Sequence, residues 1–194
     1  GDYARFIEYL YACNDAHPFR RDMLTSHSHA SILQIEREEP LVAVIAYCLM
    51  PNHFHLVLRE ITEGGIKCFM QKLGTAYTMY FNAKNDRIGG LFVRPFRAKH
   101  IHNDVYLKHV IQYVHLNPAE LYEPEWKDGV VNNMRSLKQN LGVYPYSSLG
   151  DFIGIQRAEG MILDQNMTRS LYDSLPSLAE SVHGAADYYS SLRW

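Results

Sequence analysis

Apolar side chains recur at three- and four-residue intervals in three parts of the chain, and this spacing is typical of helices with one buried face. The three parts are residues 2–16, 66–81 and 104–116. The second follows the Glu63-Gly64-Gly65 stretch and predicts a helix of about five turns. Asn103 or Asp104 suits the cap of the third, which runs to Leu116 before Pro118 stops it.

Three other segments follow the pattern of strands. Residues 41–49 are apolar on both sides and predict a strand buried on both faces. Residues 53–59 alternate and predict its partner after a tight turn at 50–52. Residues 91–101 suit an edge or bulged strand, because Pro95 has no N–H for a central ladder. The pattern therefore predicts an α+β protein with an antiparallel sheet.

The composition is that of an ordinary globular protein and excludes several classes. The chain has 194 residues, 47% of them hydrophobic, and a formal net charge of −2, so any nucleic-acid binding must depend on a local basic patch. No apolar run is long enough to cross a membrane, and no signal peptide opens the sequence. Three widely spaced cysteines predict reduced thiols and a cytoplasmic protein.

Two histidines stand two residues apart at the start of the alternating strand. Side chains of a strand alternate between its faces, so His53 and His55 point the same way while Phe54, Leu56 and Leu58 face the core. The two imidazoles could share one metal ion, or they could be solvated surface histidines. A second pair with the same spacing, in Ser26-His27-Ser28-His29, lacks apolar flanks and is interpreted as a loop.

Tyr113 and Asn117 lie one turn apart near the end of the third helix. Their i, i+4 spacing lets both side chains reach the same point. Tyr113 lies at the edge of the buried stripe, and Asn117 precedes the proline that ends the helix, so its amide is expected to swing freely. His115 is expected to face solvent. A half-buried packing tyrosine and an asparagine cap are the alternative interpretations.

These motifs resemble those of a known family. Leu-Met-Pro-Asn-His-Phe-His-Leu-Val-Leu at 49–58, followed by Tyr-Val-His-Leu-Asn-Pro at 113–118, is similar to the single-tyrosine HUH transposases, and most similar to their REP-associated branch. The likeness spans roughly residues 2–154. It implies a ferredoxin-like sheet with helices on one face in a catalytic domain over 1–155. Residues 156–194 are expected to form a mostly helical C-terminal extension.

The resemblance also implies a mechanism. His53, His55 and Asn117 match the family's metal ligands, and Tyr113 matches its nucleophile. It implies a metal-dependent transesterase, with Mg²⁺ or Mn²⁺, that nicks and rejoins single-stranded or hairpin DNA through a 5′-phosphotyrosine intermediate. Such a protein works at the bacterial nucleoid, as a monomer or a homodimer.

The chain departs from the family at its N-terminus. Members usually begin with a strand and an Arg-Gly turn, whereas this sequence starts inside the first helix. A domesticated DNA-binding protein without cleavage is therefore a second hypothesis. A replication or mobilisation initiator and a metallohydrolase that activates water are further alternatives.

Basic residues in the 91–101 segment form the predicted contact with DNA. Arg94, Arg97 and Lys99 alternate with Phe92 and Phe96 just before the nucleophile helix. Phosphate contact and a solvated strand face are both consistent with this pattern.

Overall fold

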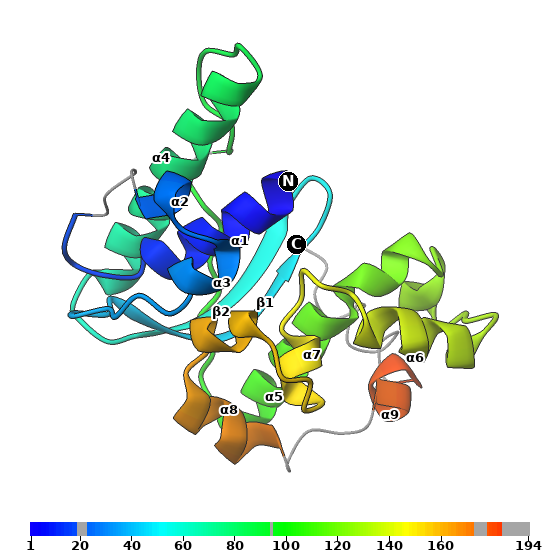
Figure 1. The fold of residues 1–194 in the computed structure, drawn as a ribbon. Coiled ribbons are helices and arrows are strands. Elements are labelled where there is room, and N and C mark those ends of the chain that lie inside the picture. The colour runs from blue at the N-terminus through cyan, green and yellow to red at the C-terminus, as the bar shows by residue number, and fades with distance from the viewer. Residues whose placement is uncertain (19–22, 94, 173–177, 184–194) are drawn as a thin grey trace. The chain divides into compact units, whose positions relative to one another are not determined.

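The computed structural model describes residues 1–18, 23–93, 95–172 and 178–183. Within them the protein has an antiparallel pair of strands and several helices, so the predicted α+β class is confirmed (Figure 1). No helix of the described residues is long and apolar enough to cross a membrane. The ferredoxin-like arrangement and the boundary at residue 155 stay predictions.

A hairpin of strands β1 (Val42–Leu49) and β2 (Phe54–Glu60) carries the two central histidines. Every residue of β1 is buried, as its apolar sequence predicts. The Met50 N–H donates to the His53 carbonyl over 2.8 Å and closes the turn between the strands. The other edge of β1 is also occupied, through an antiparallel bridge from Cys48 to Ser147 and a parallel bridge from Val44 to Leu163. Both predicted strands of the hairpin are confirmed.

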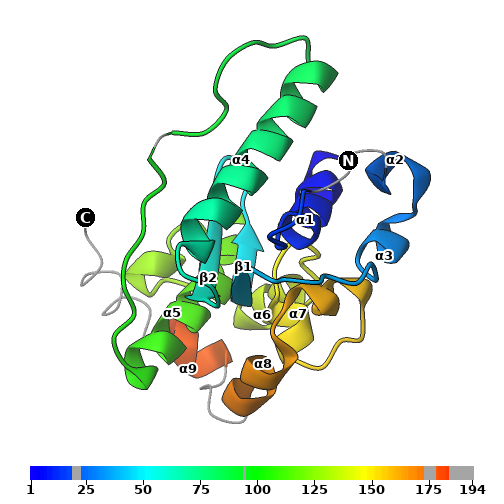
Figure 2. The same ribbon diagram turned by 90° about the vertical axis from the view of Figure 1, so that its left-hand side faces the viewer.

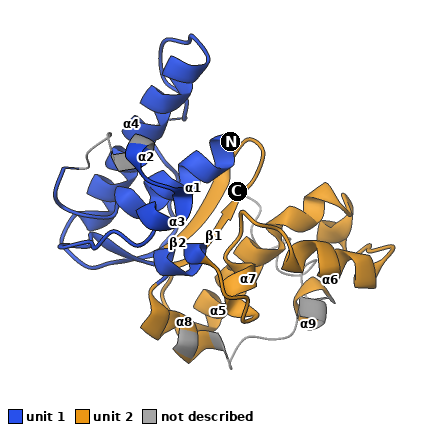
Figure 3. Cartoon of the chain, in the orientation of Figure 1, with its two compact units in different colours: residues 1–44, 58–100, 158–163 blue, residues 45–57, 101–157, 164–194 orange. Residues whose placement is uncertain are grey.

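The chain forms two compact units, and each takes part of the hairpin (Figure 3). The first unit comprises residues 1–44, 58–100 and 158–163. Its helices are α1 (Asp2–Ala12), α2 (Met23–Ser26), α3 (His29–Ile32), α4 (Gly65–Lys84) and η3 (Ala158–Ile162). Helix α1 lies beside the long helix α4 (Figure 2), and the rings of Phe6 and Tyr77 meet edge to face with centroids 4.9 Å apart.

The start of α4 is fixed by a glycine and a carboxylate. Gly64 has φ +74°, a backbone conformation that few residues other than glycine adopt. A Cβ on Gly65 would lie 2.3 Å from the Leu41 carbonyl oxygen, so no larger residue fits there. The Glu60 carboxylate accepts the N–H groups of Gly64 and Ile66 over 3.0 and 3.1 Å, which satisfies two amides of the helix start.

The second unit holds the helices that follow the loop segment. It comprises residues 45–57, 101–157 and 164–194. Its described helices are α5 (Asp104–Leu116), η1 (Asn117–Leu121), η2 (Trp126–Asp128), α6 (Met134–Gly142), α7 (Leu149–Phe152), α8 (Gln165–Tyr172) and α9 (Leu178–His183). Trp126, with no exposed surface, packs in a cluster with Leu116, Leu137 and Leu141. This cluster lies directly behind the end of α5.

The strand predicted over 91–101 is wrong. Described residues 91–93 and 95–101 adopt neither helix nor strand, and the stretch from Val93 to His100 is exposed where described. Pro95 cannot donate to a ladder. Among the described residues β1 and β2 form a sheet of two strands, which gives this segment no paired neighbour.

Candidate metal and nucleophile site

The hairpin brings His53 and His55 together. His53 ends the turn and His55 is the second residue of β2. Their ring centroids lie 4.9 Å apart with planes nearly perpendicular at 89°. The prediction that the two imidazoles lie side by side is confirmed, and the reason is the alternation of side chains along an extended chain.

Helix α5 brings Tyr113 to the same place. Its N-terminus is capped by Asn103, whose side chain accepts the Tyr106 N–H over 2.8 Å, so the predicted cap is confirmed. The Tyr113 ring meets the His55 ring edge to face, with centroids 5.2 Å apart and an angle of 84°. His53, His55 and Tyr113 therefore form a continuous row of rings within the second unit.

Asn117 follows one turn later and is fixed rather than mobile. It is the first residue of η1 and only 1% exposed. Its Nδ2 donates to the Tyr113 carbonyl over 2.7 Å. The expectation of a freely swinging amide is wrong, because the chain continues past Pro118 into a buried 3₁₀ turn instead of leaving the protein surface. With Nδ2 engaged, Oδ1 remains available as an acceptor or a metal ligand.

The predicted division between a core face and an open histidine face of β2 is wrong. Val57, on the face of the histidines, is 2% exposed and is the most buried residue of the strand. Phe54, Leu56 and Leu58, on the opposite face, are only half-buried. The cause at the site is α5, whose Tyr113 ring covers His55. His53 stays exposed.

This cover keeps the site neutral. Burial, the neighbouring His53 and Lys127 together lower the pKa of His55 to about 4. Burial also lowers the pKa of His53. Burial raises the pKa of the Tyr113 hydroxyl, against the opposing effect of the Asn117 amide. At neutral pH both imidazoles are therefore deprotonated and the phenol is protonated.

An ion pair beside the site was not predicted from the sequence. Lys127 Nζ lies 2.6 Å from Glu120 Oε2, and the two charges act on the pKa of His53 in opposite directions. Glu120 stands three residues after Asn117, a spacing that could have indicated it. Lys127 gave no such signal, because its position depends on how Trp126 is buried.

His115 is buried, contrary to the prediction that it faces solvent. It is 3% exposed, and its Nε2 lies 2.8 Å from the Ser148 hydroxyl. Its ring meets Phe152 with centroids 4.7 Å apart. Burial lowers its pKa to about 3. Helical periodicity failed here because residues 144–152 cover a side of α5 that a lone amphipathic helix would leave to water.

The donor atoms present suit a divalent cation. His55 Nε2 is buried and has no hydrogen-bond partner among the described residues, so a group normally satisfied at a cost of a few kcal/mol is left for a ligand. His53 Nδ1 lies 2.7 Å from Asn52 Oδ1, a contact that favours the tautomer with its lone pair on Nε2. No three His, Cys, Asp or Glu side chains among the described residues are grouped for a metal, so Asn117 Oδ1 is needed as the third ligand.

The predicted DNA-binding residues lie outside this cluster. Arg97 and Lys99 are exposed and belong to the first unit, and Arg94 lies outside the described residues. Their contact with phosphate stays a prediction.

The second histidine pair does not form a site. His27 Nδ1 lies 2.9 Å from the Ser26 hydroxyl. His29 instead lies between two carboxylates, with Nδ1 3.0 Å from Glu8 and Nε2 3.2 Å from Glu159. This pairing explains His29 as a link between α1, α3 and η3 in the first unit.

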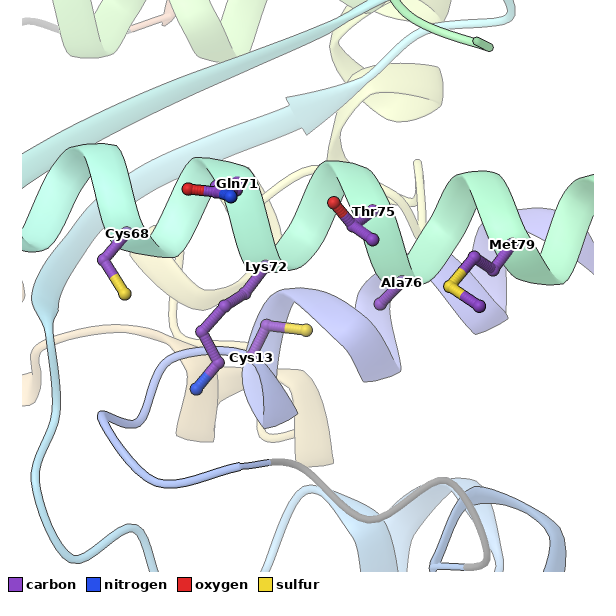
Figure 4. Close-up of a pocket in the computed structure, with 7 residues that line it drawn as sticks. All are labelled: Cys13, Cys68, Gln71, Lys72, Thr75, Ala76 and Met79. Atoms are coloured by element: carbon purple, nitrogen blue, oxygen red, sulfur yellow. The ribbon is translucent and has the colours of Figure 1, made fainter. Parts of the chain in front are cut away.

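A hollow of about 460 Å³ in the first unit lies along α4 (Figure 4). Cys13 and Cys68 line it, and all three cysteines of the chain are free of disulfides. Burial raises the pKa of the Cys13 thiol to about 12, which makes it a poor nucleophile at neutral pH. Lys72 at its edge donates to the carbonyls of Asp15 and His17. The hollow has no group arranged for catalysis.

Comparison with known proteins agrees with the geometry. Residues 12–117, more than half of the chain, match the family described as IS200-like transposases. The match includes both histidines, Tyr113 and Asn117. No curated protein and no solved structure is similar enough to count as a match. With this match and the row of rings in the second unit, the chain belongs to the IS200-like transposase family.

Proposed function

We propose that this protein is a metal-dependent single-stranded DNA transesterase, which nicks and rejoins DNA through a covalent bond to Tyr113. Membership of the family implies DNA processing by a transposase-like protein. One observation supports the finer statement. Two imidazoles, a phenol and a buried amide come from a strand and a helix and meet within one unit.

The reaction exchanges one phosphoester for another. The Tyr113 oxygen bonds to phosphorus, the bond from phosphorus to the 3′ oxygen breaks, and the phenolic proton is balanced by the proton on the new 3′-OH. The 5′ phosphate of the downstream strand stays on the tyrosine. A 3′-OH from another strand can reverse the step, so rejoining needs no ATP.

The chain supplies positioning and the metal ligands. His53, His55 and Asn117 would hold the ion, and proteins of this family generally use divalent metals. Mg²⁺ or Mn²⁺, when bound, would act as a Lewis acid on the phosphate. Nitrogen and oxygen ligands together also admit other first-row metals.

Tyr113 has to lose its proton for the reaction. An ordinary tyrosine is only about one part in a thousand phenolate at pH 7, and burial lowers this fraction further. The side chain is held against His55, whose neutral ring cannot stabilise a phenolate by charge. Activation of Tyr113 therefore depends on the bound cation and substrate.

Single-stranded or hairpin DNA is the proposed substrate, because an extended strand exposes its phosphates to a compact site. Exposed Arg97 and Lys99 would contribute phosphate contacts. The monomer and the homodimer both remain compatible with this function.

A DNA-binding protein without cleavage is the second candidate. The raised pKa of Tyr113 favours it, because a buried, protonated phenol is a weak nucleophile. The covalent adduct separates the two candidates.

The test is an adduct gel with two labels. Random single strands and hairpins are labelled at the 3′ end or the 5′ end and incubated with Mg²⁺ or Mn²⁺. The proposed chemistry transfers only the 3′ label to protein, because the tyrosine retains the downstream strand. Tyr113→Phe should abolish this band, and Tyr106→Phe, on the same helix, should retain it.

Three outcomes contradict the proposal. DNA binding without an adduct supports the second candidate. Cleavage without an adduct indicates water as nucleophile, as in a metallohydrolase. An adduct that survives Tyr113→Phe but not Tyr106→Phe moves the nucleophile to Tyr106, whose ring stacks on His102 with centroids 5.3 Å apart.

A further inference from the structure

The segment from Tyr144 to Ser148 binds the edge of β1 just before the histidine turn. The Tyr144 hydroxyl donates to the Leu49 carbonyl over 2.7 Å, and the Leu49 N–H donates to the Tyr146 carbonyl over 2.9 Å. Ser148 binds Tyr47 twice through hydrogen bonds to its backbone. Its N–H donates to the Tyr47 carbonyl over 2.9 Å, and its hydroxyl accepts the Tyr47 N–H over 2.9 Å.

The same hydroxyl also contacts the nucleophile helix. His115 Nε2 lies 2.8 Å from Ser148 Oγ, and both residues are buried, at 3% and 0% exposed. Whichever tautomer His115 adopts, one hydrogen bond joins the two atoms. A single oxygen therefore connects β1 to α5.

A guanidinium holds this segment in place. Arg157 donates to the carbonyls of Pro145 and Ser147 and forms an ion pair with the Asp151 carboxylate at 2.6 Å. Phe152, on α7, packs against the His115 ring. The segment is thus a fixed support rather than a loose loop over α5.

His115 stands between the two residues whose placement matters. Tyr113 precedes it by two residues and Asn117 follows it by two. Strand β1 leads through the turn at 50–52 to His53. The hydrogen bond from His115 to Ser148 therefore joins the element that carries the phenol and amide to the element that carries the histidines, at a point that touches neither.

We propose that His115 and Ser148 are positioning residues, which fix the Tyr113–Asn117 segment against the hairpin that carries His53 and His55. The catalytic consequence rests on the proposed function, but the placement itself does not. A displacement of about 1 Å at such a site can cost about a hundredfold in rate, so one hydrogen bond at this joint is enough to matter.

Two substitutions break the bond from opposite ends. His115→Phe keeps a ring against Phe152 and removes Nε2. Ser148→Ala removes the hydroxyl. His115→Gln is the rescue variant, because its amide nitrogen stands the same number of bonds from Cα as Nε2 of histidine. Ile7→Val, in the buried core of the first unit, is the control for a small loss of stability.

The first measurement needs neither metal nor DNA. Nuclear Overhauser effects between the His55 and Tyr113 rings report their contact, which has a centroid distance of 5.2 Å. We expect these effects to weaken at least about twofold in His115→Phe and Ser148→Ala, because they fall steeply with distance. We expect them to be unchanged in His115→Gln and Ile7→Val.

The second measurement is the single-turnover rate of adduct formation, below the melting temperature of every variant. A fall of about tenfold or more in His115→Phe and Ser148→Ala is expected, with recovery in His115→Gln and no change in Ile7→Val. A residue that only stabilises the fold would lower the melting temperature and leave both readouts as in the wild type.

Unchanged Overhauser effects in both bond-breaking variants would overturn the inference. So would failure of both variants to fold, because the pair would then be required for folding and not for placement. An absent adduct in the wild type would overturn the proposed function instead, and the Overhauser comparison would still decide the inference.

Discussion

Acid should destabilise this protein through His115, before the carboxylates begin to titrate. The folded protein holds this imidazole 3% exposed between Ser148 and Phe152, with a pKa lowered from 6.5 to about 3 by burial. The unfolded chain exposes it to water. As the pH falls below 6.5, the unfolded chain gains a proton that the folded protein does not take up, so the free energy of unfolding decreases.

The size of this effect follows from the pH interval. Each pH unit between the folded and unfolded pKa costs about 1.4 kcal/mol, so lowering the pH from 7.5 to 5 removes about 2 kcal/mol. The result is insensitive to the folded pKa, provided that it lies below 5. His55, with its pKa lowered to about 4, contributes a loss of the same sign. These losses are large against a typical stability of about 5–15 kcal/mol.

The assay compares urea unfolding of the wild type and His115→Gln at pH 7.5 and pH 5, with EDTA present to exclude metal. The glutamine keeps a donor for Ser148 and cannot titrate. We expect the wild type to lose about 2 kcal/mol more than the variant between the two pH values. His109→Gln, which replaces an exposed histidine of the same helix, is the control and should behave as the wild type.

An equal loss in wild type and His115→Gln would refute the reasoning, because it would mean that His115 takes up its proton in the folded state. Carboxylates do not obscure the comparison. Asp2, Asp15 and Glu123 have a pKa below their ordinary values of 3.8 and 4.5, so their stabilisation is present at pH 5 and is lost mainly below it. They are also common to both proteins.

Three further predictions concern the site and the DNA contacts. His53→Ala should abolish adduct formation with a nearly unchanged melting temperature, because the side chain is exposed, whereas His55→Ala should also lose some stability; a large fall for His53→Ala would indicate a structural histidine. Asn117→Ala should slow adduct formation, with partial rescue at high Mn²⁺, and cost about 1–3 kcal/mol in urea unfolding, because it removes a buried hydrogen bond to a carbonyl; normal rates at low Mn²⁺ would exclude it as a ligand. Replacing Arg97 and Lys99 by Ala should reduce the salt dependence of single-strand binding by about 0.7 in log–log slope per contact, and an unchanged slope would assign them to solvent.

The hairpin and the ring cluster could be predicted because they depend on local rules. Alternation fixes the relation of His53 to His55, and helical spacing fixes that of Tyr113 to Asn117. Each rule acts over a few residues, and the structure follows both. The contact between the two pairs was predicted from the family resemblance, because no spacing rule relates residue 55 to residue 113.

The failures all concern surfaces covered by distant segments. His115 and Val57 were expected at the surface, but residues far along the chain bury them. The mobility expected of Asn117 failed for the same reason, since burial of η1 depends on the Trp126 cluster. The strand expected near Pro95 failed because a strand needs a partner, which local sequence does not report. Periodicity predicts which face of an element is apolar, but not what covers the other face.

The charge of the candidate site leads to the last prediction. At neutral pH His53 and His55 are neutral, Tyr113 is protonated and Asn117 carries no charge, so these donors do not neutralise a divalent cation. A DNA phosphate would supply the missing negative charge. Metal and DNA should therefore bind cooperatively, and the coupling must be the same in both directions. In Tyr113→Phe, which cannot cleave, single-stranded DNA should tighten Mn²⁺ binding about tenfold, a coupling of about 1.4 kcal/mol, and Mn²⁺ should tighten DNA binding equally. Titrating each ligand with and without the other measures both effects. Mn²⁺ binding that is equally tight without DNA would show that the chain itself supplies the negative charge, with Glu120 the first residue to test, because it lies beside the site in an ion pair with Lys127.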